Sequence, residues 1–96
     1  MFRHIVMLSF KAPLSARDHE DIADQCRAIK EALPGIIDLR FVANASDRAR
    51  SYTHAFVADF IDAAAHDRYQ QSPVHAPLKQ KVMALGQQLI VLDYET

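Results

Sequence analysis

The sequence has one cysteine, two glycines, no tryptophan and no long apolar run. A lone Cys26 excludes an internal disulfide and any metal site built from several thiolates, and it is typical of a reducing compartment, so we expect a cytoplasmic protein. Two glycines are too few for a glycine-rich phosphate-binding loop, which argues against nucleotide chemistry. The apolar runs are far shorter than the roughly 18 residues of a membrane helix, and no membrane partner is expected.

Neither sign of charge is in large excess. Eleven lysines and arginines offset twelve acidic residues, which gives a net charge of −1. No basic face or arginine-rich run stands out, so we expect no nucleic-acid partner.

The 96 residues predict one domain, residues 1–96, and a chain of this length buries only about 60–65% of its unfolded surface.

Four segments show the two-residue alternation of strands, namely Met1–Phe10, Ile36–Ala43, Tyr52–Phe60 and Gln88–Tyr94. The first and third are apolar in both alternating sets. A strand with one face in water should be polar on that side, so this pattern indicates that both faces of the sheet are covered.

Helical periodicity fills the two gaps between these strands. Ser15 is a candidate N-cap, and Pro34-Gly35 ends the first helix. The apolar stripe of that helix is Ile22, Cys26, Ile29 and Leu33. Asp62 caps a second helix, which Ser72-Pro73 interrupts and which continues to Leu85.

The element order predicts an α+β fold, a ferredoxin-like protomer with a four-stranded antiparallel sheet. Helices would cover one face of this sheet. The other face would carry Ile5, Met7, Ala55, Val57, Ile90 and Leu92. Burying roughly 500–800 Å² of it would gain about 12–20 kcal/mol, before association costs of similar size. We therefore predict a homodimer that pairs sheet to sheet.

The segment Tyr69–His75 is the main candidate for chemistry, because it brings a phenol and an imidazole to a break between helices. His75 stands near a helix start, where the helix dipole favours the neutral ring and hence a proton acceptor. The alternative is that His75 only caps the turn. Tyr69 could assist the base or simply fill the core.

Other histidines are weaker candidates. His4 either lines a pocket or is a hydrogen-bonded core residue, and His54 either takes part in the site or holds the third strand. The spacing of His4, His54 and His75 matches no metal signature and no acidic partner is evident, so neither a metal nor a cofactor is expected. His19 and His66 are expected to be solvated.

Five short segments, in this order, resemble the stress-responsive A/B barrel (Dabb) family. They are His4-Ile5-Val6, Leu33-Pro34-Gly35, Tyr52-Thr53-His54-Ala55, Tyr69-Gln70-Gln71-Ser72-Pro73-Val74-His75 and Leu92-Asp93-Tyr94. The resemblance covers nearly the whole chain. It implies a ferredoxin-like protomer that pairs with a second copy as a dimeric α+β barrel, in a family most of whose members have no assigned reaction.

One branch of that family, the plant polyketide cyclases of the olivetolic acid cyclase kind, closes a linear polyketide with a histidine base and an assisting tyrosine. The resemblance assigns these roles to His75 and Tyr69, and it matches His4 and His54 to further histidines of the branch. The first helix departs from this pattern, because Ile22, Ala23 and Cys26 stand where the branch has large aromatics.

These observations predict a mostly apolar pocket between helices and sheet. Its polar edge would be His4, His54, Tyr69 and His75, and its lining Val6, Leu8, Ile22, Cys26, Leu39, Phe56, Leu89 and Val91. The first hypothesis is a homodimer that binds a small apolar molecule. The second is a cofactor-free cyclase, isomerase or monooxygenase-like enzyme that acts on a carbonyl compound. The third is a purely structural dimer.

Overall fold

The computed structural model describes residues 1–96. Its elements follow the predicted order of strand, helix, strand, strand, broken helix and strand. They are β1 (Phe2–Phe10), α1 (Ala16–Ala32), β2 (Ile36–Ala43), β3 (His54–Phe60), α2 (Ala63–Gln71), the short 3₁₀ turn η1 (Pro73–His75), α3 (Ala76–Leu85) and β4 (Gly86–Glu95).

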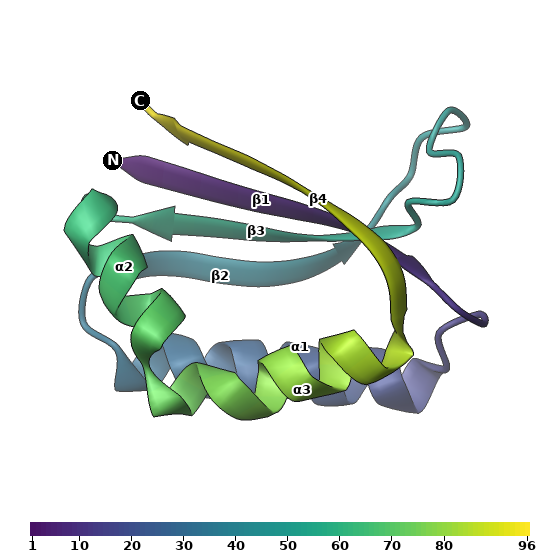
Figure 1. The fold of residues 1–96 in the computed structure, drawn as a ribbon, viewed down its shortest axis with the longest axis horizontal. Helices are drawn as coiled ribbons and strands as arrows, with labels where there is room; N and C mark the ends of the chain where they lie inside the picture. The colour runs from purple at the N-terminus through teal and green to yellow at the C-terminus, as the bar shows by residue number, and fades with distance from the viewer.

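The four strands form one sheet in the order β2-β3-β1-β4, and every neighbouring pair is antiparallel. The helices lie on one face of this sheet, with α1 and α3 running side by side beneath it (Figure 1). The opposite face has no covering element within the chain. This is the ferredoxin-like α+β fold, as predicted.

The core lies between the sheet and α1. Ile22, Cys26 and Ile29 are the buried residues of α1, as its apolar stripe predicted. They pack in one cluster with sheet residues such as Leu8 and Phe60, neither of which is exposed. Even-numbered residues of β1, His4 to Leu8, therefore face the helices, which settles the side of the sheet that periodicity left open.

Two polar side chains start the helices as expected. The Ser15 Oγ accepts a hydrogen bond from the Asp18 amide, 3.0 Å away, and the Asp62 carboxylate accepts one from the Ala65 amide at 2.8 Å. Gly35 follows α1 with a φ of +103°, and a Cβ there would lie 3.0 Å from the Ala65 Cβ. This turn therefore needs glycine.

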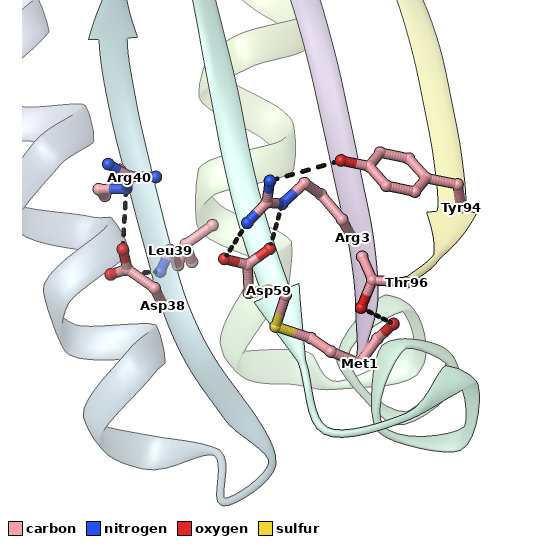
Figure 2. Close-up of polar contacts among 8 residues, drawn as sticks. All are labelled: Met1, Arg3, Asp38, Leu39, Arg40, Asp59, Tyr94 and Thr96. Carbon is pink, nitrogen blue, oxygen red and sulfur yellow. Dashed lines mark hydrogen bonds and ion pairs between the residues drawn. The ribbon is translucent and has the colours of Figure 1, made fainter.

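The open face of the sheet is organised in cross-strand rows. The strand register forms two largely apolar rows, Leu92-Ile5-Val57-Arg40 and Ile90-Met7-Ala55-Val42. A third row at the chain ends is polar. There Arg3 reaches Asp59 on one side and the Tyr94 hydroxyl on the other, with Nε 2.6 Å from Asp59 Oδ1 (Figure 2).

The third strand starts later than its sequence pattern suggests. It was predicted from Tyr52 but pairs only from His54, whose partner is Ala43. Before that pair the two segments are joined by the Asn44 residue alone, whose amide donates to the Thr53 carbonyl at 2.8 Å and whose Nδ2 donates to the Tyr52 carbonyl at 3.0 Å. The fourth strand is longer than predicted and begins at Gly86.

Candidate functional site

A cavity of about 370 Å³ lies between the sheet and the segment from α2 to α3. It has twelve lining residues, eight of them hydrophobic: His4, Val6, Phe56, Tyr69, Gln70, His75, Leu78, Lys79, Val82, Met83, Leu89 and Val91. The predicted pocket residues His4, Val6, Phe56, Tyr69, His75, Leu89 and Val91 thus meet in one place. This size is within the range of small-molecule sites.

Strand register positions the floor of the cavity. Val6 of β1 pairs with Phe56 of β3 on one side and with Val91 of β4 on the other, so the three side chains point the same way. β4 is the edge strand, and its residues Leu89 and Val91 remain 54% and 48% exposed. The cavity is therefore open along β4.

Tyr69 and His75 are held together at one wall by the Ser72-Pro73 break. Their rings stack with centres 4.1 Å apart and an angle of 30° between planes. The Ser72 Oγ accepts a hydrogen bond from the Val74 amide and caps the turn, whereas the His75 side chain makes no capping hydrogen bond. His75 still occupies the N-cap position of α3, and its backbone amide donates to the Ser72 carbonyl at 3.1 Å.

The environment shifts the pKa of both rings. Burial lowers the pKa of His75 to about 4. Smaller effects in the same direction come from Lys79 and from the imidazoles of His4 and His66. The ring is therefore neutral at pH 7. Burial is also the main reason that the pKa of Tyr69 lies above its usual value, with a smaller effect from Cys26, so the phenol keeps its proton.

His4 is buried at the same end of the cavity and is 7% exposed. Its Nδ1 lies 2.5 Å from Oδ1 of Asp93, its pairing partner on β4. A carboxylate at Nδ1 favours the tautomer that has its proton on that nitrogen, which leaves Nε2 as the acceptor of the neutral ring. The Tyr69 ring stands edge-on to His4, with centres 6.5 Å apart.

The structure places His54 away from this group. It pairs with Leu8, four residues along β1 from His4, a distance of roughly 13 Å in a strand. There it stacks on Phe41, with ring centres 5.1 Å apart, and its Nδ1 lies 2.8 Å from the Thr53 Oγ1. It lines a separate hollow of about 470 Å³. The expectation that His54 edges the same pocket is therefore corrected.

Four predicted lining residues are also outside this cavity, namely Leu8, Ile22, Cys26 and Leu39, which are 0–4% exposed in the core. These residues lie on the helix-facing side of their strands or on the sheet-facing side of α1, as predicted. Their side chains pack against one another in the core and fill the space beneath the sheet. Burial raises the pKa of the Cys26 thiol to about 12, as expected of an unreactive packing residue.

Several cavity residues were not predicted: Gln70, Leu78, Lys79, Val82 and Met83. Helical spacing from His75 contains the signal for three of them, because Leu78, Lys79 and Val82 are the third, fourth and seventh following residues and share its helix face. His66 was expected in solvent and this is wrong, since it is 9% exposed and packs beside His4. His19 is partly buried against Phe41.

The model of one family, described as the stress responsive A/B barrel domain, matches residues 2–96. The chain belongs to this family. The resemblance drawn from the five sequence segments is thereby confirmed. No curated protein matches the chain, and no helix is long and apolar enough to cross a membrane.

Solved structures show the same fold. The Arabidopsis thaliana protein At3g17210 has a TM-score of 0.87 at 19% identity, and the match covers 100% of this chain and 95% of the Arabidopsis chain. A hydroxynitrile lyase from Passiflora edulis has a TM-score of 0.83 at 23% identity, with 97% and 90% covered. A dimeric ferredoxin-like protein of unknown function from Jannaschia has a TM-score of 0.77 at 25% identity, with 99% and 98% covered.

Proposed function

We propose that this family member is a homodimer that binds a small apolar molecule carrying a carbonyl group in the cavity edged by His4, Tyr69 and His75. The observation that carries the proposal is the cavity of about 370 Å³ with a mostly hydrophobic lining and these three polar rings at one end. Pockets of this kind use apolar walls for affinity and a few polar groups for orientation.

The walls and the polar end have separate roles in this proposal. Val6, Leu78 and Val91 would hold a hydrocarbon part, since removal of apolar surface from water is the main source of affinity. The Tyr69 hydroxyl keeps its proton and can donate to a carbonyl oxygen. The Lys79 ammonium adds a positive charge at the lining and would favour an acidic or enolic group.

The open face of the sheet supports the homodimer. The row of Leu92, Ile5 and Val57 is apolar in three of the four strands, and the row of Ile90, Met7, Ala55 and Val42 is apolar in all four. Relatives of the same fold are described as dimeric. A second copy would cover these rows and offset the small core of a short chain. The absence of a nucleic-acid partner and a cytoplasmic location stay predictions from composition.

A second candidate function is a cofactor-free enzyme that uses His75 as a base on the proton next to a carbonyl group. The feature that favours it is the neutral His75 ring, which has no hydrogen bond from its side chain to the protein and lines the cavity. In such a step the imidazole takes the α-proton, and Tyr69 donates to the enolate oxygen that forms. The cavity itself weighs against a purely structural dimer.

The test uses an alkyl methyl ketone with the whole protein in deuterated water. NMR reports binding through shifts of ketone and protein signals, and it reports base chemistry through exchange of the ketone α-protons. We expect binding by the wild type and much weaker binding by Val6→Trp, which fills the floor of the cavity. Val57→Thr, on the opposite face of the sheet, is the matched control and should bind normally.

His75→Gln separates the two candidates. A binding protein keeps its ketone affinity within a few-fold in this variant and shows no protein-dependent exchange in either form. An enzyme of the second kind exchanges α-protons faster than buffer, and His75→Gln removes that acceleration. Equal ketone binding by the wild type and Val6→Trp would contradict both candidate functions.

A further inference from the structure

Three possible metal-ligating side chains come together around His4, beside the cavity, one from each of three elements. They are His4 of β1, His66 of α2 and Asp93 of β4, and their ligand atoms all lie within 4.8 Å of one another. Both imidazoles are buried, at 7% and 9% exposure. The ketone-binding proposal uses neither His66 nor Asp93.

The spacing of the rings suits a shared ion. An imidazole nitrogen binds zinc at about 2.0–2.1 Å, which puts each ring centre roughly 3.2 Å from the metal and two ring centres about 4.5–5.2 Å apart. The rings of His4 and His66 are 4.6 Å apart and inclined at 47°. The Asp93 carboxylate is 2.5 Å from the His4 Nδ1. Binding of an ion between these two atoms requires the ring proton of His4 to move from Nδ1 to Nε2, so that Nδ1 has a free lone pair.

We propose that His4, His66 and Asp93 bind a divalent first-row transition-metal ion of the zinc or cobalt type. Two imidazoles and one carboxylate suit these ions, whereas calcium and magnesium prefer sites made of oxygen ligands alone. No acidic partner for the histidines was expected from their spacing in the sequence. The pairing of β4 with β1 supplies one, because it sets Asp93 opposite His4.

The surroundings of His66 fit this role. The Gln70 side-chain amide lies 3.1 Å from Nε2. With its oxygen turned to Nε2–H, this amide would fix the ring and leave Nδ1 free as the ligand. Three protein ligands leave a position for water or a small molecule.

The experiment titrates Co²⁺ into the untagged, chelator-treated full-length chain and follows its visible absorption, with Zn²⁺ calorimetry as a second measure. We expect one ion per chain. Asp93→Asn and His66→Gln should each weaken binding by about tenfold or more. The matched control is His19→Gln, which removes a partly buried histidine beside Phe41 and should leave the affinity unchanged.

Asp93 stands on the exposed edge strand, so Asp93→Asn should fold, and circular dichroism would verify this. Co²⁺ binding that is equal in wild type, Asp93→Asn and His66→Gln, or no Co²⁺ binding by the wild type, would overturn the proposal. The three side chains would then be a hydrogen-bonded network only. Ketone binding is measured in the presence of a chelator, so failure of either proposal leaves the other standing.

Discussion

The ring of His75 lies face to face with that of Tyr69, with the two centres 4.1 Å apart. Tyr69 is 5% exposed and anchors this pair in the core. The stack covers one side of the imidazole and leaves its edge, with both nitrogens, without a protein partner. It therefore removes water from the ring while leaving its nitrogens free to meet a ligand.

Substitutions at Tyr69 should separate the packing of the ring from the chemistry of its hydroxyl. Tyr69→Phe keeps the stack, and no hydrogen bond within the protein is lost, so we expect the free energy of unfolding to change by less than about 1 kcal/mol. Tyr69→Ala leaves a hole and should cost about 3–5 kcal/mol. Urea denaturation measures both. A large loss in Tyr69→Phe would mean that the hydroxyl stabilises the fold.

The buried imidazoles should make the protein less stable in mild acid. The pKa of His75 is about 4 when folded and about 6.5 when unfolded, so between these values only the unfolded chain takes up the proton. The contribution of His75 to stability is complete above pH 6.5 and is lost as the pH falls toward 4. Burial lowers the pKa of His54 and His66 in the same direction.

The measurement compares urea denaturation of wild type and His75→Gln at pH 7 and pH 5. We expect the free energy of unfolding to fall less in the variant, because one of the groups that take up a proton on unfolding is gone. An equal fall in both proteins would contradict the assigned pKa of His75.

A charge on the open face of the sheet should dissociate the proposed dimer. Leu92 is 56% exposed in the single chain and lies in the row with Ile5 and Val57. Leu92→Lys should weaken self-association by about tenfold or more, since an unpaired ammonium would be buried at the interface. Ile61→Lys changes an equally exposed residue after β3, away from that row, and serves as the control. Analytical ultracentrifugation would measure the self-association of both variants. Equal dissociation constants for Leu92→Lys and Ile61→Lys would argue against this interface.

Cys26 should resist thiol reagents until the chain unfolds. The side chain is 2% exposed and burial raises its pKa to about 12, so almost no thiolate is present at pH 8. We expect iodoacetamide labelling in native buffer to be at least a hundredfold slower than in urea. Mass spectrometry would follow the reaction, and fast native labelling would show that α1 opens readily.

The fold was largely predictable because each local signal agrees with the others. Alternation placed β1 and β2, and the caps Ser15 and Asp62 marked the helix starts. The site was less predictable, because it depends on which residues pair across the sheet. Alternation puts His4 and His54 on helix-facing sides alike, but only the register shows that His54 lies opposite Leu8 and far from His4.

The same reasoning applies to Asp93 and His66, the two neighbours of His4 that were not predicted from the sequence. Asp93 lies almost at the end of the chain, and only the antiparallel pairing with β1 brings it to His4. His66 follows an alanine-rich stretch whose helical pattern does not by itself tell which side faces the sheet. Contacts with Phe2 and Phe60 determine that side in the folded protein.

The first and last residues of the chain meet, since the Thr96 hydroxyl donates to the Met1 carbonyl at 3.3 Å (Figure 2). The Thr96 amide donates to the same carbonyl at 2.9 Å. A short linker could therefore join the two ends into a circle, and the chain could be reopened between residues 45 and 51 without cutting a strand. Such a permuted protein would make β1 and β4 one continuous hairpin. It would also move any fused tag to the opposite end of the sheet from His4.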